Sequence, residues 1–380
     1  MARSGTPAVT ESSELVLLPL SDPSAWDTAL RRVGQRDVYH SSAYHRCIRS
    51  TEGGDAYLFV LSSPGGDVAA MPFLVRRVAT VEGLEDRAAV DATSVEGYPG
   101  AVCSPVTGEG ARRAFRRRFQ GALLEVLTDL GVVTFFGRQN PFHATEWLFD
   151  GVGEIRRLGS TVAVDCITSE DEHQGQMSSH HRRNLRKVRR EGLRMVRDPD
   201  GSCLPEFVAM YRQTMDRVGA TAGYYYPDDY FRALMHGLGD DAFLAIAELD
   251  GEPVNGALFL QGPSVVHYHL GGTSEQFRNL GASHVLFDEV RRWCKEGGRR
   301  WLHLGGGVGA GEDSLFRFKS GFSKERFPYH VVRLVVDQDA AEELVAQRHA
   351  WLSAQGLTAS TDFFPAYRAP AVKPDPREEG

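Results

Sequence analysis

Apolar and polar residues alternate along the first part of the chain in a pattern that predicts an antiparallel strand meander with helices around it. Between two of the apolar runs stands Ser62-Ser-Pro-Gly-Gly-Asp67, which is typical of a hairpin turn. Residues 23–50 and 112–130 have a helical pattern, and Gly131 is expected to end the second helix. The apolar runs that we interpret as strands are residues 14–20, 55–61, 68–75 and 132–136.

The second half of the chain repeats this plan. Leu249-Asp-Gly-Glu-Pro253 stands where the hairpin turn stood in the first half. Residues 283–296 predict a helix, because Leu286, Val290 and Trp293 form an apolar stripe at helical spacing. The runs that we interpret as strands are residues 241–248, 254–260, 265–270 and 300–304.

The repeated plan predicts an α+β protein made of two domains of one type in tandem, in preference to one large sheet. A chain of 380 residues is long enough for two hydrophobic cores. We assign residues 14–165 to the first domain and residues 166–370 to the second, each a mixed, mostly antiparallel sheet flanked by helices. The polar ends, residues 1–13 and 371–380, are expected to be flexible tails.

The charge balance narrows the choice of partner. The net charge is −7, from 43 basic and 50 acidic residues, which excludes a general polyanion binder. No DNA partner is therefore expected, and any contact with RNA has to come from a local basic patch. No apolar run approaches the length of a transmembrane segment.

The cysteines and histidines give no indication of a metal site. The five cysteines are scattered and form no Cys-x-x-Cys pair, which favours reduced thiols in a cytoplasmic protein. His267 and His269 share one face of a predicted strand, and Tyr268 takes the other face. No cysteine or carboxylate spacing supports zinc beside these histidines, so we predict neither a metal nor a cofactor.

A glycine-rich loop, Gly305–Gly311, leads to the segment Phe318-Lys319-Ser320-Gly321-Phe322. A lysine between aromatic residues can be a fixed cation beside an apolar wall, and a fixed ammonium stabilises the oxyanion of an acyl-transfer intermediate. We therefore predict Lys319 as the catalytic residue, the alternative being an exposed lysine near the edge of a strand. The sequence has no Gly-x-Ser-x-Gly elbow and no paired Cys/His motif, which favours direct attack by a substrate amine on a bound acyl donor.

A strongly basic helix is predicted between the two domains, within residues 180–192, with Ser178 or Ser179 as its N-cap. Its cations form a local electrostatic footprint for phosphate or an RNA backbone, although a solvated helix is the alternative. The cations are Arg182, Arg183, Arg186, Lys187, Arg189 and Arg190.

A second candidate phosphate site lies before the helix at 283–296. Arg278-x-x-Gly281-Ala282-Ser283 approximates the Q/R-x-x-G-x-G/A loop of the GCN5-related acetyltransferases, with serine in the last position. Such a loop offers backbone N–H groups to a phosphate at a helix N-terminus. The alternative is an ordinary strand-to-helix turn.

The segment Tyr224-Tyr-Tyr-Pro-Asp-Asp-Tyr230 and the strand residue Tyr268 supply the candidate walls of a substrate pocket. We predict that Tyr225, Tyr226, Tyr268 and Phe318 bind substrate, the alternative being that the tyrosines belong to the core.

Residues 175–335 resemble the FemABX (Fem-like) aminoacyl-tRNA-dependent transferases. The resemblance is carried by the basic segment 182–188, by Leu270-Gly-Gly-Thr273 and by Leu280-Gly-Ala-Ser-His284. Its most specific part is Leu315-Phe-Arg-Phe-Lys-Ser-Gly-Phe322, which resembles the family's F-K-x-G-F segment. The predicted duplication also fits, because that family pairs two acetyltransferase-like domains.

The resemblance implies that the protein transfers an amino acid from a charged tRNA to an amine and forms an amide bond. It implies that Lys319 lies beside the acyl centre, with Phe318 as its neighbour. In the family's peptidoglycan enzymes an arginine shortly before a Tyr-Phe pair contacts a nucleotide-sugar phosphate. Residues 224–231 contain no arginine, which favours a small peptide-like acceptor, such as an intermediate of an antibiotic pathway.

Three other functions remain open at this point. An acyl-CoA-dependent N-acyltransferase would use the same fold and would not need the basic helix. A peptidoglycan interpeptide-bridge aminoacyltransferase would use the same donor. A non-catalytic RNA-binding scaffold would bind tRNA and form no product.

Overall fold

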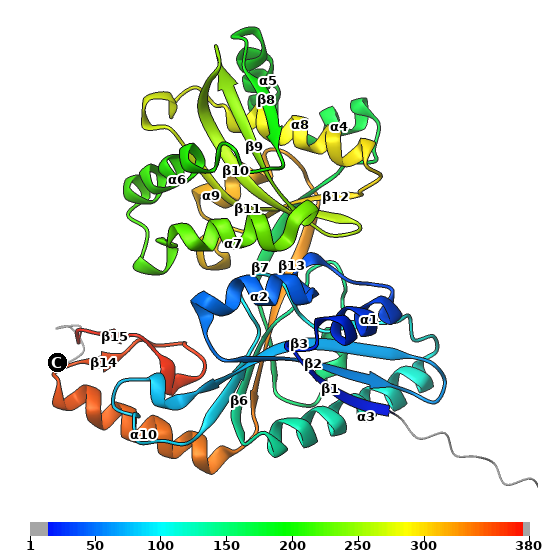
Figure 1. Ribbon diagram of the computed structural model, residues 1–380, viewed down its shortest axis with the longest axis vertical. Helices are drawn as coiled ribbons and strands as arrows, with labels where there is room; N and C mark the ends of the chain where they lie inside the picture. The colour runs from blue at the N-terminus through cyan, green and yellow to red at the C-terminus, as the bar shows by residue number, and fades with distance from the viewer. Residues whose placement is uncertain (1–13, 375–380) are drawn as a thin grey trace, which may run out of the picture.

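The computed structural model describes residues 14–374 and shows two lobes joined by long strands (Figure 1). The lower lobe in Figure 1 contains the first half of the chain and its C-terminal end, and the upper lobe contains most of the second half. The elements of the first half are β1 (Glu14–Pro19), α1 (Pro23–Val33), η1 (Val38–His40), α2 (Ser42–Glu52), β2 (Asp55–Ser62), β3 (Val68–Arg77), η2 (Val78–Thr80), β4 (Val90–Thr93), β5 (Val102–Cys103), α3 (Glu109–Asp129), β6 (Val132–Arg138) and η3 (Glu146–Phe149).

The second half repeats the order of the main elements. Its elements are α4 (Glu170–Gln176), α5 (Ser179–Arg190), β8 (Arg194–Asp198), α6 (Leu204–Val218), η4 (Ala222–Tyr224), α7 (Asp228–Leu238), η5 (Gly239–Asp241), β9 (Ala242–Leu249), β10 (Glu252–Gln261), β11 (Val265–Thr273), η6 (Glu275–Phe277), α8 (Ser283–Glu296), β12 (Trp301–Gly305), η7 (Val308–Ala310) and α9 (Ser314–Ser320). Most predicted strands and the predicted helix at 283–296 are confirmed, whereas the stretch 23–50 forms two α-helices separated by η1.

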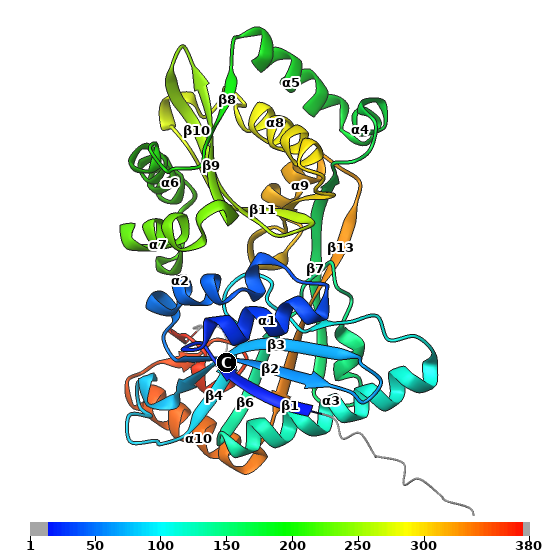
Figure 2. The same ribbon diagram turned by 45° about the vertical axis from the view of Figure 1, so that its right-hand side comes forward.

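Two long strands join the halves. β7 (Glu154–Asp165) and β13 (Arg326–Val335) are antiparallel neighbours, and both run between the two lobes in Figures 1 and 2. β13 also pairs with β6 of the first half, and β7 also pairs with β12 of the second half. Each half therefore completes its sheet with a strand from the other side of the connection.

This exchange makes one continuous sheet. The strand order is β1-β2-β3-β4-β6-β13-β7-β12-β11-β10-β9-β8, and β5 pairs with β3. The prediction of two similarly built α+β units is confirmed, but our preference for separate sheets over one large sheet was wrong. Pairing of β7 with β13 fuses the two sheets, and this long-range pairing leaves no local pattern in the sequence.

Helices cover both faces of this sheet. In the first half, α3 packs over Phe59 and Phe135. In the second half, α5 and α8 pack over Phe259 and Leu302. A further core lies between the lobes, where Tyr44 of α2 and Tyr230 of α7 are both buried. The facing helices α2 and α7 mark this junction in Figure 1.

The end of the chain returns to the first half. α10 (Gln338–Ala354) packs beside β6, and the hydroxyl groups of Tyr367 and Thr134 lie 2.7 Å apart. Arg368 forms an ion pair with the buried Asp91. The last residues of our second domain therefore pack on the first.

The prediction of a flexible tail from residue 371 was also wrong at its start, because β15 (Ala371–Val372) pairs with β14 (Thr358–Ala359). The rest of that tail, residues 375–380, and the tail at 1–13 lie outside the described residues. Within residues 14–374, no helix combines the length and apolar character that a bilayer-crossing segment requires.

Candidate active site

The candidate site begins where the ladder between β11 and β12 ends. These parallel strands pair only from Val265 with Trp301 to His267 with His303. Both strands continue beyond this point, β11 against β10 and β12 against β7. We call the position beyond His267 and His303 the ladder end.

The side chain of Lys319 lies at the ladder end. Its Nζ donates a hydrogen bond of 2.7 Å to the carbonyl oxygen of Gly306, just after β12, and lies 5.6 Å from the centre of the Tyr268 ring on β11. The residue is 6% exposed, so the prediction of a fixed, buried cation is confirmed and the exposed alternative is excluded. No other hydrogen bond to Nζ is found among residues 14–374, which leaves two of its three donors for a ligand.

Burial lowers the pKa of Lys319 to about 8, although Asp313 acts in the opposite direction. An ammonium of this kind is charged at neutral pH and only weakly compensated by protein groups. It is therefore available to stabilise an anion that forms next to it.

The segment that carries Lys319 is helical, which the sequence pattern did not predict. α9 begins at its N-cap Asp313, whose side chain accepts hydrogen bonds from the backbone N–H groups of Phe316 and Val308. The C-terminal end of α9 is held by α5, because His181 Nε2 lies 2.9 Å from the carbonyl oxygen of Phe318. A Cβ atom on Gly321 would lie 2.2 Å from the His181 ring, so only glycine allows this approach.

The glycine-rich loop closes tightly on the strand beside it. A Cβ atom on Gly159 of β7 would lie 2.1 Å from the carbonyl oxygen of Ala310, and one on Gly307 would lie 2.2 Å from that of Gly311. Gly305 has φ of +77°, and its open side faces Lys319 Nζ. The glycines thus bring the backbone close to the ammonium, as the sequence led us to expect.

The six cations of α5 divide into two groups. Arg182 donates to the carbonyl oxygens of Gln174 and Met177, and Arg189 pairs with Asp288 and Glu289. These two arginines hold the helix in place, so their assignment to phosphate binding is not supported by the packing. The other four cations, Arg183, Arg186, Lys187 and Arg190, are exposed.

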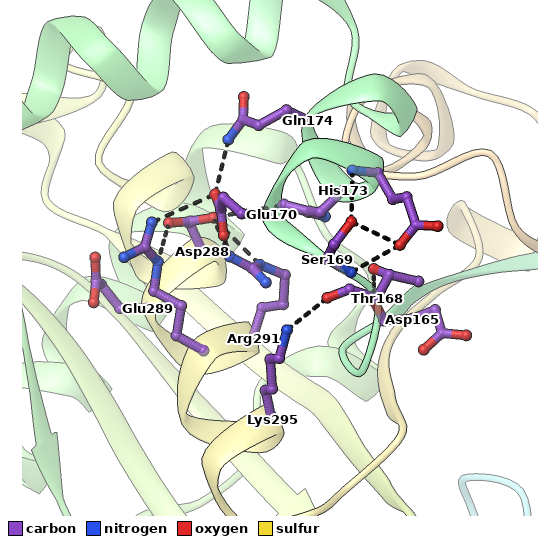
Figure 3. A network of polar contacts seen from close by, with 12 residues as sticks. Asp165, Thr168, Ser169, Glu170, His173, Gln174, Asp288, Glu289, Arg291 and Lys295 are labelled. Carbon is purple, nitrogen blue, oxygen red and sulfur yellow. Dashed lines mark hydrogen bonds and ion pairs between the residues drawn. The ribbon is translucent and has the colours of Figure 1, made fainter.

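A polar network fixes α4 against α8 (Figure 3), and Arg189 connects it to α5. Its centre is Asp288, which accepts from Arg189, Arg291 and Arg292. Burial would raise the pKa of Asp288, but His173 and these arginines lower it to about 2. Glu170 completes the network with Arg291, as Figure 3 shows.

The loop Arg278–Ser283 leads into the N-terminus of α8, as predicted. Arg278 is exposed and pairs with Glu275, Gly281 has φ of +80°, and Ala282 is the N-cap. Ser283 is the first residue of the helix, and no side chain caps it. The rings of His284 and His181 lie 4.6 Å apart, so the N-terminal ends of α8 and α5 are neighbours.

The predicted aromatic wall is only partly assembled. Phe318 and Tyr268 pack with the core cluster under α5 and α8, on the side of Lys319. Tyr226 packs with the cluster between the lobes, where its hydroxyl group donates to Glu96 of the first half. Tyr225 is 43% exposed and donates to Asp216, so it does not join Phe318 and Tyr268 either. The structure therefore separates Tyr226 and Tyr225 from the pair beside the lysine.

Residues of the first half also reach the ladder end, which no motif in the sequence predicted. The phenol oxygen of Tyr98 lies 3.6 Å, and Lys319 Nζ 3.4 Å, from the position that a Cβ atom of Gly305 would take. Asp37 accepts from His267 Nε2 at 2.9 Å, and His267 Nδ1 lies 3.0 Å from His303 Nδ1. Within residues 14–374, no group of three histidine, cysteine or acidic side chains is arranged to hold a metal ion.

We compared the chain with known protein families and solved structures. Residues 176–320 match the model of the acetyltransferase (GNAT) domain family, from the end of α4 to the end of α9. The chain resembles FemX at 14% identity with a TM-score of 0.64, over 87% of this chain and 99% of that one. A search among curated proteins gave no match.

Two further structures share the fold. L-PGS from Bacillus licheniformis is 16% identical, with a TM-score of 0.50, over 86% of this chain and 96% of that one. The C-terminal domain of a protein described as a lysylphosphatidylglycerol synthetase from Agrobacterium fabrum is 16% identical, with a TM-score of 0.50, over 85% of this chain and 95% of that one. The chain therefore has a Fem-like tandem fold with a GNAT acyltransferase domain in its second half.

Proposed function

We propose that this protein transfers an aminoacyl group from aminoacyl-tRNA to the amine of a small peptide-like acceptor. The observation that carries the proposal is the buried ammonium of Lys319, with free donors, at the ladder end of the GNAT domain. The Fem-like fold supports an aminoacyl donor, since the FemABX transferases that the sequence resembles use charged tRNA.

The reaction that we propose needs no protein nucleophile. The neutral amine of the acceptor attacks the ester carbonyl that joins the amino acid to the tRNA ribose, and a C–N bond forms. Lys319 donates a hydrogen bond to the resulting oxyanion. The C–O bond to the ribose then breaks, the ribose oxygen takes up a proton, and the amide product carries one proton fewer than the amine.

The donor tRNA is assigned to the exposed cations of α5, which adjoin the segment holding Lys319. Arg183, Arg186, Lys187 and Arg190 are not buried in internal ion pairs, unlike Arg182 and Arg189. The nearby N-terminus of α8, with Gly281, Ala282 and Ser283, can take a phosphate of the same strand. Phosphate contacts of this kind make binding dependent on salt.

The acceptor is assigned to the space beside Tyr268, Phe318 and the residues that the first half contributes. The segment 224–231 has no arginine to clamp a nucleotide-sugar phosphate, which supports a small peptide-like acceptor of an antibiotic pathway over a muropeptide. In such a pathway the product is an amide that a peptide-modifying enzyme can accept.

A second candidate is an acyl-CoA-dependent N-acyltransferase, because the matched family model is that of acetyltransferases. One experiment separates the two. The purified protein is incubated with candidate amine acceptors and either a mixture of charged tRNAs or acyl-CoA, each with and without RNase, and amide products are read by mass spectrometry. Product that disappears with RNase supports the proposal, whereas product that forms only with acyl-CoA and survives RNase overturns it.

A further inference from the structure

A chain of three buried polar side chains crosses the junction between the two halves. Asp37 precedes η1 in the first half, His267 lies on β11 and His303 lies on β12. They are 4%, 0% and 1% exposed. Neither the sequence motifs nor the mechanism above uses them, although such groups are costly to bury without a role or a partner.

Asp37 fixes the direction of the hydrogen bonds in this chain. Its carboxylate accepts from the backbone N–H of Val38 at 2.6 Å, from Asn140 Nδ2 at 3.2 Å and from His267 Nε2 at 2.9 Å. Burial alone would raise the pKa of Asp37, but the facing His267, with His40 and His143, holds it well below its usual range. An ionised carboxylate only accepts hydrogen bonds, so the proton between the two residues is on His267 Nε2.

The remaining protons follow from this assignment. The relay requires a resting His267 that carries a proton on Nε2 alone, and such a ring can only accept at Nδ1. His303 Nδ1 lies 3.0 Å away and therefore carries the proton of that hydrogen bond. His303 Nε2 is then left with an unshared electron pair, and this buried nitrogen has no hydrogen-bond partner within residues 14–374.

The chain can take up one proton without leaving a positive charge on His303. A proton that arrives at His303 Nε2 allows the Nδ1 proton to move across to His267. The positive charge then lies on His267, in contact with the carboxylate of Asp37. A charge left on His303 would be unfavourable, because burial, His267 and Lys319 all lower the pKa of that ring.

The free end of the chain lies beside the ladder end. The register between β12 and β7 shifts between His303 and Gly305, and Tyr98 contacts both positions. Gly305 faces both Lys319 Nζ and Tyr98 Oη, and the Tyr98 ring packs edge-on against His303 at 4.9 Å. The ionisable groups that surround His303 are His267, Asp37, Lys319 and Tyr98.

We infer that His303 Nε2 is the base that accepts the proton released by the acceptor amine, with Asp37 and His267 as the residues that position it. This inference rests on the proposed function. As the C–N bond forms, one amine proton passes to His303 Nε2, and the oxyanion is held by Lys319. When the C–O bond breaks, this proton reaches the leaving ribose oxygen, directly or through solvent, so protons and electrons balance.

Two substitutions test the relay, and a third serves as a matched control. His303→Asn keeps a donor near the position of Nδ1 and removes Nε2. Asp37→Asn keeps the shape of the carboxylate, but its amide donates to His267 and reverses both tautomers, which places a proton on His303 Nε2. His269→Gln alters another histidine on the same face of β11, which contacts Tyr230 at 2.8 Å and lies outside the relay.

The relay predicts that His303→Asn and Asp37→Asn each lower the single-turnover rate by roughly a hundredfold or more, as expected for loss of a general base. The acid limb of the rate–pH profile should also disappear in His303→Asn. The control His269→Gln should keep the wild-type rate and profile. Equal, small losses of rate in all three variants, together with lower melting temperatures, would show that these residues only stabilise the fold. That result would overturn the inference.

A measurement without substrate separates this inference from the proposed function. Nitrogen-15 NMR of histidine-labelled protein reports which ring nitrogen carries the proton. The relay predicts an unprotonated Nε2 on His303 in the wild type and a protonated one in Asp37→Asn. An Nε2-protonated His303 in the wild type would refute the relay, whereas failure to use charged tRNA would refute only the proposed function.

Discussion

The two halves of this protein share one plan, yet only the second leaves its central ladder incomplete. In the first half, β4 pairs with β6 from Val90 to Thr93, and the connection continues through Ser94, which bonds to the backbone of Phe136 and Arg138. In the second half, the matching ladder stops at His267 and His303, and Lys319 lies beyond it. The two halves therefore have similar strand plans within one continuous sheet, and we call the first the closed half and the second, where Lys319 lies beyond the ladder, the open half.

The closed half still contributes to the site. Asp37 and Tyr98 come from the first half and lie next to residues of β11 and β12. The exchange of β7 and β13 fixes the position of one half relative to the other. The contacts of Asp37 and Tyr98 with β11 and β12 therefore have a defined geometry. We propose that the first half works as a support and the second as the reacting centre.

The largest expected effect comes from removing the ammonium of the open half. Lys319→Met should lower the single-turnover rate of transfer by roughly a hundredfold or more, because one preorganised oxyanion donor is lost. The matching change in the closed half, Arg138→Met, removes its bonds to the carbonyl oxygens of Ser94 and Val95 and should change the rate only a few-fold.

The melting temperatures of Lys319→Met and Arg138→Met show whether a loss of rate comes from unfolding. Burial lowers the pKa of Lys319 to about 8, so the ammonium is still charged at neutral pH but its burial destabilises the folded protein. Methionine should therefore leave the melting temperature unchanged or raise it. Equal rate losses in both variants would contradict the assignment of chemistry to the second half.

A smaller effect is expected where α5 braces the segment of Lys319. Gly321→Ala places a methyl group against the His181 ring and should separate α5 from α9. We expect a lower melting temperature, because the added methyl group overpacks this contact. We also expect a rate reduced by about tenfold, because Lys319 is displaced from the reacting carbonyl.

The matched change in the first half is Gly121→Ala in α3, where no neighbouring atom lies within 4 Å of the added Cβ. That substitution should stabilise the helix by about 1 kcal/mol and leave the rate intact. Thermal melts and single-turnover assays of both variants check this difference. If Gly321→Ala changes neither the melting temperature nor the rate, α5 does not position the segment that carries Lys319.

The smallest expected effect concerns donor binding. Reversing two exposed charges of α5, Arg186→Glu with Arg190→Glu, should raise the KM for charged tRNA several-fold and reduce its salt dependence, with little change in kcat. The first half offers a control of the same composition, since Arg117 and Arg118 are exposed on α3. If Arg117→Glu with Arg118→Glu weakens tRNA binding as strongly, the exposed cations of α5 are not a specific binding site for the donor tRNA.

Local patterns in the sequence were enough to predict most elements and part of the site. The helix 283–296 was predicted with its observed bounds, because its apolar stripe and flanking glycines are local features. Ser178 caps α5 as proposed, and the aromatic residues around Lys319 indicated a buried cation. In each of these cases the residues that determine the structure are close in sequence.

The features that could not be predicted depend on distant residues. Asp37 and His267 are 230 positions apart, and nothing in either neighbourhood indicates the other. The pairing of β7 with β13 likewise cannot be read from the pattern of apolar and polar residues in either strand. Tyr226 was assigned to the site from its aromatic neighbours, but the sequence could not show that Glu96 of the first half would hold it at the junction. One signal was present and unused: histidines at 267 and 303 interrupt otherwise apolar strands.

The most direct test of the central claim is the alkaline limb of the single-turnover rate of transfer. Lys319 has a pKa of about 8, lowered by burial, and stabilises an oxyanion only when it is protonated. Above the acid limb, the rate should therefore be retained up to about pH 8 and fall as the pH rises through that value, in protein that remains folded. A rate unchanged up to pH 10, or an alkaline limb that persists in Lys319→Met, would contradict the role given to the buried ammonium.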